Sequence, residues 1–406
     1  MAAPSPAPAA GLDFRIFDCD NHYYEALDAF QRHVDPSLGP RGVQWCEMDG
    51  RRHHVVGGRV SFAVRNPTFD PISKPGCLYD FLRGNPKGEN PLVRLRDAEP
   101  IPDHYRRPDA RLRVMDAQGL EAIWLFPTLG VLYEQLLLPD IEAVTKVFTG
   151  FNRWLDEDWG LAYRGRIFAA PYLSLCDVAW ACAELEWALA RGARVLCMRP
   201  AAAWTRDGPR SPADPVFDPF WARLNEAGVT LVIHAGDSGY STNGYADDRF
   251  SAFGQNAAVG YVRPSIKGWS FERAAMDFLA TLIFDRLFER FPNLRVASVE
   301  NGSEFLPYLL RKLASSGRNL RHWYRQDPVE TFRRHVWINP FWEDDVAEVA
   351  ALMGADRVLF GSDWPHIEGL PEPGYSVDEL RAKFGPEDLR RILRDNVRAL
   401  NEPARS

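Results

Sequence analysis

Short apolar runs alternate with longer segments of helical periodicity along most of the chain. The short runs predict strands, and the amphipathic segments between them predict helices. Strands are expected over 14–20, 121–126, 167–171, 195–199, 229–234, 294–300, 336–339 and 358–360. Helices are expected over 109–118, 141–158, 177–191, 219–227, 271–291, 303–313, 344–352 and 378–400. This alternation implies parallel βαβ units, and the number of strands favours a closed (β/α)8 barrel, the TIM barrel, over an open α/β sheet.

Two parts of the chain depart from this alternation. The chain begins with MAAPSPAPAA, which has neither a basic segment nor a continuous apolar run, so 1–12 is expected to be a disordered tail and not a signal peptide. Between 34 and 100, Gly and Pro cluster, and pairs such as Asn66-Pro67 interrupt short segments. We expect 34–100 to be an insertion that caps a site, and 13–402 as a whole to be one domain.

The balance of residue types is that of a folded protein in water, with 46% hydrophobic and 25% charged residues. The net charge of -7 arises from 55 acidic and 48 basic residues that are mixed along the chain, which argues against nucleic acid or an anionic membrane as a partner. The six cysteines show no C-x-x-C spacing, and no apolar stretch is long enough to span a bilayer. We therefore expect a cytoplasmic protein with reduced thiols.

Chemically active residues collect where the expected strands end, which is the catalytic face of a (β/α)8 barrel. They are Asp20, His22, His234, Glu300, Asp363 and His366. Side chains two apart in an extended strand point the same way, so Asp20 and His22 can reach one point on the barrel axis. A single residue of this kind is more often a helix cap or a hydrogen-bonded core residue. Agreement among the first, fifth and eighth strands favours a metal site, and its carboxylate and imidazole ligands suit zinc, manganese or iron(II).

Several segments resemble those of one known family. The segments FDCDNHYYE, LVIHAG, VASVENGSEFLP, VWINPFWEDD and VLFGSDWPHIEG are similar to the amidohydrolase-related family of TIM-barrel, metal-dependent hydrolases and decarboxylases. That family includes aminocarboxymuconate semialdehyde decarboxylase and γ-resorcylate decarboxylase. The resemblance runs from about 14 to 400 outside the insertion, and GSDWPH is its most specific short piece.

The resemblance implies a ligand set. The first-strand ligand pair of the family falls on Asp20 and His22, the fifth-strand ligand on His234, and the eighth-strand ligand on Asp363. Binuclear relatives carry a bridging Lys at the end of the fourth strand, where this chain has Met198-Arg199-Pro200. A single divalent cation is therefore implied, with zinc expected before manganese or iron(II). The habit of the family also implies a homo-oligomer, such as a homodimer.

The sequence departs from the better-known decarboxylases after the sixth strand, where they carry a His and this chain has Glu300. A carboxylate in a dry site beside a metal can act as acid or base, or it can orient a ligand histidine, and both roles stay open. His366 could handle a proton or donate to a substrate carboxylate, or it could merely pack in its loop. Asp363 could accept a proton from metal-bound water.

One positively charged side chain and several aromatic side chains are expected to bind the substrate. Arg199 at the end of the fourth strand could clamp an anion or form a structural ion pair. Aromatic residues near strand ends are expected to line a flat apolar pocket suited to an aromatic or conjugated acid. They are Tyr23, Tyr24, Trp124, Phe341, Trp342 and Trp364.

Three functions follow from these features. The first is metal-assisted, non-oxidative decarboxylation, or a related C–C cleavage, of a small carboxylic acid. The second is hydrolysis of an amide, lactone or C–C bond by metal-activated water. The third is a ligand-binding barrel that keeps a metal for structure, which would lack an open coordination position.

Overall fold

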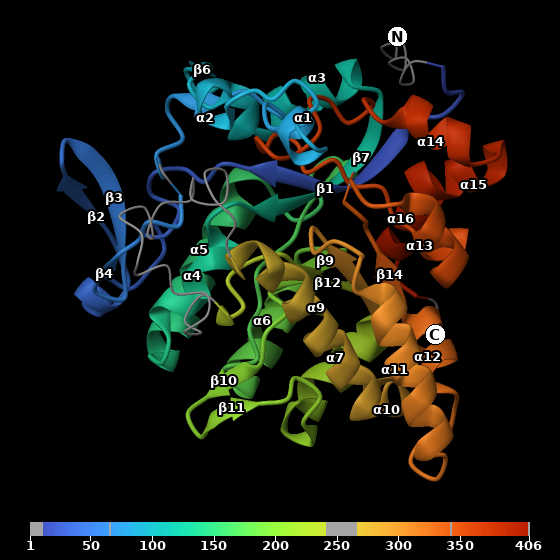
Figure 1. Ribbon diagram of the computed structural model, residues 1–406. Helices are drawn as coiled ribbons and strands as arrows, with labels where there is room; N and C mark the ends of the chain where they lie inside the picture. The colour runs from blue at the N-terminus through green and yellow to red at the C-terminus, as the bar shows by residue number, and fades with distance from the viewer. Residues whose placement is uncertain (1–10, 65, 241–265, 342, 405–406) are drawn as a thin grey trace.

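The computed structural model of the protein describes residues 11–64, 66–240, 266–341 and 343–404 (Figure 1). Most of the expected tail over 1–12, and also Trp342, therefore lie outside the described residues. Among the helices that are described, none combines the length and the apolar character needed to cross a membrane.

Parallel strands from along the whole chain form the centre of the molecule. One set is hydrogen-bonded in the order β1-β7-β8, and a second in the order β9-β12-β13-β14. Their bounds are β1 Ile16–Tyr23, β7 Leu120–Pro127, β8 Ile167–Ala169, β9 Val195–Met198, β12 Thr230–His234, β13 Arg295–Val299 and β14 Val336–Ile338. All residues of β1 and β12 are buried, as expected for strands that are covered on both faces.

Single parallel bridges close the gaps between the two sets of strands. A bridge between Tyr172 and Cys197 joins the end of β8 to β9. On the other side, residues 358–364 bridge to β14 and then to β1, and so take the eighth place in the circle. The expected (β/α)8 barrel is confirmed, with its eighth strand present as isolated bridges and not as a regular strand.

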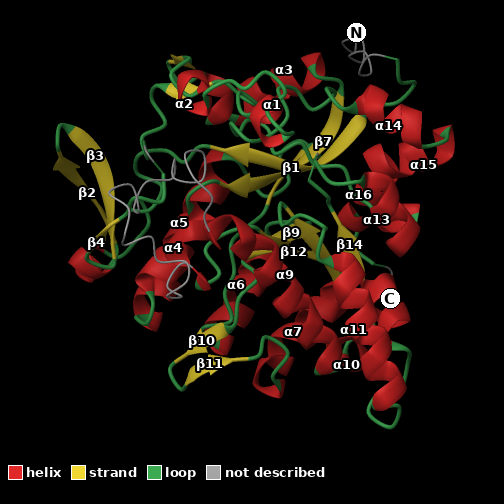
Figure 2. Ribbon diagram, in the orientation of Figure 1, coloured by secondary structure: helices red, strands yellow, loops and turns green. Residues whose placement is uncertain are grey.

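Helices cover the outside of the barrel (Figures 1 and 2). The helix expected over 271–291 is interrupted because Arg286 has a left-handed φ of 54°, and the helix expected over 378–400 is divided at Gly385. The bounds are α3 Pro108–Ala117, α4 Gly130–Leu137, α5 Ile141–Asp158, α6 Val178–Ala190, α7 Asp218–Ala227, α9 Ile266–Phe284, α10 Leu287–Arg290, α11 Leu306–Asn319, α12 Pro328–His335, α13 Val346–Met353, α14 Val377–Lys383, α15 Pro386–Arg390 and α16 Asn396–Asn401.

The stretch between 34 and 100 forms small elements of its own. An antiparallel sheet of β2, β3 and β4 projects from the side of the barrel, and β5 pairs with β6 (Figure 2). A further hairpin, β10 and β11, follows β9. The bounds are β2 Val43–Met48, β3 Arg51–Val56, β4 Arg59–Val60, β5 Ile72–Ser73, α1 Tyr79–Leu82, α2 Pro91–Arg94, β6 Ala98–Glu99, β10 Ala203–Thr205 and β11 Gly208–Arg210.

Aromatic side chains fill much of the layer between the strands and the helices. The Tyr23 ring packs on Trp154 and Trp159, with ring centroids 5.5 and 5.8 Å away. The indole N–H of Trp124 donates to Asn401 Oδ1 at 3.0 Å. Tyr23 and Trp124, which the sequence suggests as pocket residues, are therefore part of the packed core, where each aromatic ring buries a large apolar area.

Candidate metal centre

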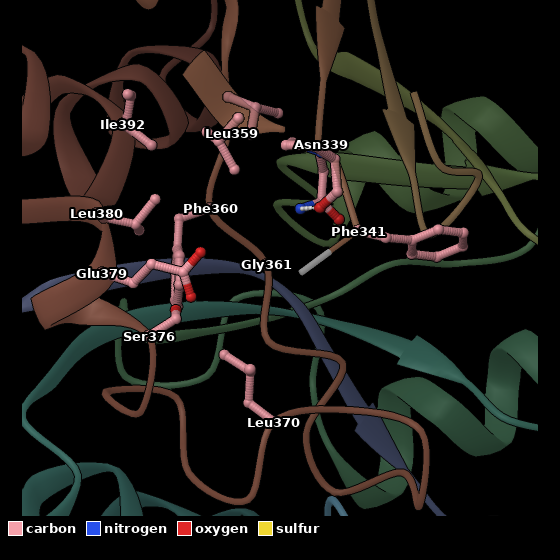
Figure 3. Close-up of a pocket in the computed structure, with 12 residues that line it drawn as sticks. Asn339, Phe341, Leu359, Phe360, Gly361, Leu370, Ser376, Glu379, Leu380 and Ile392 are labelled. Carbon is pink, nitrogen blue, oxygen red and sulfur yellow. Dashed lines mark hydrogen bonds between the residues drawn. The ribbon is translucent and has the colours of Figure 1, made fainter. Parts of the chain in front are cut away.

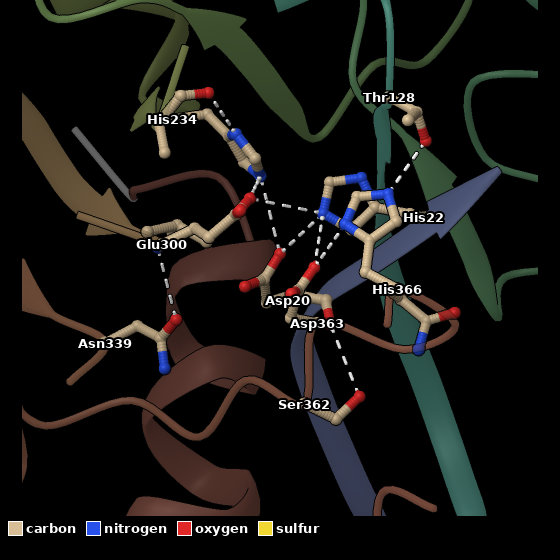
Figure 4. A network of polar contacts seen from close by, with 12 residues as sticks. Asp20, His22, Thr128, His234, Glu300, Asn339, Ser362, Asp363 and His366 are labelled. Atoms are coloured by element: carbon tan, nitrogen blue, oxygen red, sulfur yellow. Dashed lines mark hydrogen bonds and ion pairs between the residues drawn. The ribbon is translucent and has the colours of Figure 1, made fainter. Parts of the chain in front are cut away.

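Six side chains from four strand ends converge at one end of the barrel (Figure 4). The ligand atoms of one group of four, and those of a second, overlapping group of four, each lie within 4.8 Å of one another. Together the two groups contain Asp20, His22, His234, Glu300, Asp363 and His366. We call these six residues the carboxylate–histidine cluster.

Imidazole nitrogens and carboxylate oxygens face one another in this cluster. His22 Nε2 lies 3.2 Å from Asp20 Oδ1, 3.3 Å from Asp363 Oδ1 and 3.5 Å from Glu300 Oε2. His234 Nε2 lies 3.4 Å from Asp20 Oδ1 and 3.2 Å from Glu300 Oε2. The side chain of Glu300 is 18% exposed, whereas those of Asp20 and both histidines are almost fully buried. Glu300 is therefore the carboxylate through which the cluster meets solvent.

The unpaired atoms of the cluster fit a bound cation. Asp20 Oδ1, His22 Nε2, His234 Nε2 and Asp363 Oδ2 are buried without a hydrogen-bond partner in the described part of the chain. A buried polar atom that lacks a partner costs about 1–3 kcal/mol, so one ion that satisfies several of them is favoured. Imidazole and carboxylate donors in this combination suit a divalent transition metal.

The charges in the cluster are strongly coupled. Burial raises the pKa of Asp363 well above its ordinary value, and the nearby Glu300 and Asp20 carboxylates raise it further. Burial lowers the pKa of His22, but the Asp20 and Glu300 carboxylates outweigh that effect and raise it to about 10. Protons thus balance the carboxylates when no cation is bound. Because ligands must be deprotonated, binding of a cation releases protons and strengthens as the pH rises.

Unusual backbone conformations aim two members of the cluster inward. Glu300 and Asp363 have left-handed φ values of 57° and 54°, which cost roughly 1–3 kcal/mol for residues other than glycine and are concentrated at functional sites. Close approach of the eighth strand to β1 depends on Gly361, because a Cβ there would lie 2.4 Å from the Cβ of Asp20. The fold therefore tolerates local strain in order to bring the strand ends together.

A buried carboxylate ties the first strand to the eighth. Asp18 accepts hydrogen bonds from the Ser362 amide at 3.0 Å and from the Ser362 hydroxyl at 2.5 Å. It also accepts from the side chain of Asn21 at 3.0 Å. The Asp363 amide in turn donates to the Asp20 carbonyl at 2.9 Å. These bonds fix the loop that carries Asp363 relative to β1, the strand that carries Asp20.

A buried arginine supports both β1 and the loop that carries Asp363. Arg111 of α3 donates to the carbonyl of His22 at 2.6 Å and to the side chain of Asn21. Its guanidinium lies 4.8 Å from the ring centroid of Trp364, the residue after Asp363. Arg111 therefore holds the backbone of one cluster residue and packs against the neighbour of another.

His366 has its own set of contacts. Its Nδ1 lies 2.6 Å from Asp363 Oδ1, and its Nε2 lies 2.9 Å from the hydroxyl oxygen of Thr128. The Thr128 hydroxyl gives its single hydrogen to the Tyr23 carbonyl at 2.8 Å, so it accepts from His366 Nε2–H. His366 Nδ1 then faces a carboxylate oxygen, and two such atoms repel at this distance unless a proton or a cation lies between them.

The expected substrate-binding residues have other partners. Arg199 Nε lies 3.1 Å from Glu134 Oε2 in a buried ion pair, and it donates to Gln135 as well. The Trp364 ring packs on Arg111. The hydroxyl of Tyr24 donates to the Pro365 carbonyl at 3.1 Å, and its ring centroid lies 5.8 Å from that of His366. Of the three, Tyr24 packs against a member of the cluster.

A small pocket lies beside the eighth strand (Figure 3). Its walls are mainly apolar. They come from the ends of β14 and the eighth strand, from α13 and α14, and from the helical segment Arg391–Asp395. Gly361 lines the pocket and also approaches Asp20 closely. No member of the carboxylate–histidine cluster lines it, so this pocket is not where chemistry at the cluster takes place.

Comparison with known proteins decides the family. A family model described as amidohydrolase matches residues 18–400. The chain belongs to this amidohydrolase family. The solved structure of an amidohydrolase from Mycobacterium avium subsp. paratuberculosis K-10 is 42% identical, covers 97% of this chain and 100% of its own, and superposes with a TM-score of 0.89. Both the expected family and the metal-dependent enzyme class that it implies are confirmed.

Several more distant relatives of this chain are decarboxylases. The γ-resorcylate decarboxylase of Rhizobium radiobacter is 24% identical over 70% of this chain and 86% of its own length. The 2-amino-3-carboxymuconate-6-semialdehyde decarboxylase of Dictyostelium discoideum is 21% identical over 45% of this chain, and the match spans about half of that relative, 48%. A dihydroxybenzoic acid decarboxylase from Polaromonas sp. JS666, solved with manganese and 2-nitroresorcinol, shares the fold with a TM-score of 0.55. It is 18% identical, and the match covers 81% of this chain and 94% of its own.

Two residues beside the cluster, Thr128 and Arg111, are not predicted from the sequence. Thr128 follows β7 directly, so the rule that polar residues at strand ends serve the site would have found it. Arg111 carries no such signal, because an arginine within a helix is usually a surface residue. Its burial depends on the tertiary fold and is seen only in the structure.

Proposed function

We propose that this member of the amidohydrolase family is a divalent-metal-dependent, non-oxidative decarboxylase of a small aromatic or conjugated carboxylic acid. The observation that carries the proposal is the convergence of Asp20, His22, His234 and Asp363, whose inward-facing atoms lack hydrogen-bond partners among the described residues. The decarboxylase relatives favour the same reaction class. Partly exposed Glu300 beside these ligands favours a site that admits substrate over a closed structural metal.

The proposed ligands are Asp20, His22, His234 and Asp363. This donor set accepts zinc and also manganese, and manganese is the metal in the Polaromonas decarboxylase. When bound, the cation supplies positive charge that stabilises the negative charge left on the substrate as carbon dioxide departs. Glu300 Oε2, within 3.5 Å of both imidazoles, stands beside the same position.

The Asp363–His366 pair is the proposed proton donor. Decarboxylation breaks the bond between the ring carbon and the carboxylate, and that carbon must receive one proton. The 2.6 Å contact between Asp363 Oδ1 and His366 Nδ1 holds such a proton, and Thr128 fixes the orientation of the imidazole. Glu300 lies within 4.8 Å of the same groups and is the most exposed of them, so it returns a proton from solvent after each turnover.

Carbon dioxide release tests the proposed reaction. Protein loaded separately with Mn(II) and Zn(II) is incubated with 2,6-dihydroxybenzoate, 5-carboxyvanillate, other hydroxybenzoates and β-keto acids, and released carbon dioxide is measured. We expect release from at least one aromatic acid, and none after the metal is removed with a chelator. Turnover of esters or lactones without release from any acid would instead establish the hydrolase, and turnover of neither class would contradict both.

A Thr128→Val substitution removes the acceptor for His366 Nε2–H while preserving side-chain volume. We expect kcat to fall by about 10-fold to 100-fold, the usual effect of losing a partner that orients a catalytic or ligating histidine. Metal content at saturating Mn(II) should stay at the wild-type level, because Thr128 is not a member of the cluster. The measurement is kcat as a function of pH, with metal content determined on the same samples.

The matched control is Thr128→Ser, which keeps the hydroxyl and removes only a methyl group. Restoration of kcat and of the pH profile by serine assigns the effect to the hydrogen bond. Equal rates for the valine variant and the wild-type protein would show that His366 needs no orientation by Thr128.

A further inference from the structure

The insertion is bonded directly to the loop that carries Asp363 and His366. The amide of Gly76 donates to the His366 carbonyl at 2.9 Å, and the amide of Leu78 donates to the Ile367 carbonyl at 2.9 Å. Both are backbone hydrogen bonds, and their acceptors are His366, a member of the cluster, and the residue that follows it. Any shift of the segment around Gly76 therefore moves His366.

The fit at Gly76 is too close for any other residue. Its φ is +62°, and a Cβ would lie 2.4 Å from the nitrogen and 2.7 Å from the Cα of Pro371. Both are backbone atoms of the loop, so they can yield only if the loop itself moves. We name the contact of Gly76 and Leu78 with His366, Ile367 and Pro371 the clasp.

The loop held by the clasp is a compact unit. Its two ends are joined by a hydrogen bond from the Leu370 amide to the Ser362 carbonyl at 2.9 Å. Within it, the His366 amide donates to the Asp363 carbonyl at 2.9 Å. A displacement at Pro371 or His366 is therefore passed to Asp363.

A second contact from the insertion acts on the same loop through aromatic rings. Phe69 has a left-handed φ of 54°, and its ring packs on Tyr24 with centroids 4.5 Å apart. Tyr24 donates to the Pro365 carbonyl at 3.1 Å and lies beside His366, whose ring stacks on His22 at 3.9 Å. Successive ring contacts thus connect Phe69 of the insertion to His22, a proposed metal ligand.

We propose that Gly76 and Leu78 are positioning residues for Asp363 and His366, and that the insertion braces the metal centre through the clasp. This inference rests on the proposed function, because it gives the insertion a role at that same cation site. It differs from the expectation of a cap, since a cap acts on substrate entry, whereas the clasp acts on the geometry of the ligands.

The test compares Gly76→Ala with Gly88→Ala. Both glycines lie in the insertion with φ of +62°, but a Cβ at Gly88 has nothing within 4 Å, so the control carries the same backbone strain without the collision. The dissociation constant for Mn(II), measured by titration well below the melting temperature, should rise about 10-fold to 100-fold in Gly76→Ala. It should stay within about twofold of wild type in Gly88→Ala.

A merely structural glycine would lower the melting temperature of Gly76→Ala and leave its Mn(II) affinity unchanged, and that result overturns the proposal. Failure of the wild-type protein to bind Mn(II) or Zn(II) contradicts the proposed function instead, so the two failures are distinct.

Amide hydrogen exchange on the wild-type protein provides a measurement that needs no variant. Coupling between two sites is reciprocal, so a bound cation should slow exchange in the peptide containing Gly76 and Leu78 by about tenfold or more. The peptide around Gly88 serves as the internal control and should not change. Equal exchange at Gly76 and Leu78 with and without Mn(II) would rule the clasp out as a brace, even if Gly76→Ala does not fold.

Discussion

A His234→Ala variant is expected to retain less than about one-tenth of the wild-type metal content and to lose more than about 100-fold in turnover. Loss of a residue that only supports a metal ligand costs up to about 100-fold, and loss of the ligand itself should cost more. His234 Nε2 faces Asp20 and Glu300 at 3.4 and 3.2 Å. Its removal deletes one ligand and leaves two carboxylates facing each other. Metal content by plasma emission and kcat from carbon dioxide release measure the two effects.

The barrel should survive this change. β12 is hydrogen-bonded through its backbone to β9 on one side and to β13 on the other, and those bonds do not involve the His234 side chain. Circular dichroism should therefore match the wild-type spectrum. His335→Ala is the matched control, because His335 is also buried but bonds to the Leu294 carbonyl outside the cluster, and it should keep its metal. Wild-type metal content in His234→Ala would show that this histidine is not a ligand.

A Glu300→Gln variant is expected to bind Mn(II) at saturating concentration but to lose about 100-fold to 10,000-fold in kcat, the range for a group that transfers protons in catalysis. Glutamine preserves the shape of the side chain and an oxygen donor, yet it cannot exchange a proton with solvent. The measurement is kcat at saturating Mn(II), with the bound metal counted in the same sample.

Glu304→Gln is the control for charge near the barrel mouth, because Glu304 is an exposed carboxylate four residues further along. Its kcat should stay near the wild-type value. Partial recovery in Glu300→His, which restores the residue type of the better-known decarboxylases, would support a shared proton-handling position. An unchanged kcat in Glu300→Gln would reduce Glu300 to an acceptor that orients the ligand histidines.

The barrel could be predicted from the sequence because its strands are buried on both faces, and so read as apolar runs with chemical residues at their ends. The family motifs likewise pointed to Asp20, His22, His234 and Asp363, which the fold brings together. The interruption at Arg286 was not predictable, because its left-handed conformation has no signal in an amphipathic segment.

Contacts between distant segments were beyond sequence reasoning for a physical reason. Arg199 was a candidate anion clamp, and its pairing with Glu134 depends on how α4 packs against the end of β9. The backbone bonds from Gly76 to the loop of His366 leave no trace in residue types other than one glycine among many. Local pattern identifies which residues can do chemistry, whereas the packing of loops decides which of them are free to do it.

One divalent cation is proposed to bind among Asp20, His22, His234 and Asp363. Anomalous diffraction from crystals grown with Mn(II), collected on both sides of the manganese edge, tests it directly. We expect a single manganese peak at bonding distance, roughly 2.0–2.3 Å for nitrogen and oxygen ligands, from these four side chains. A peak elsewhere, two peaks in the cluster, or no peak at saturating Mn(II) would contradict it.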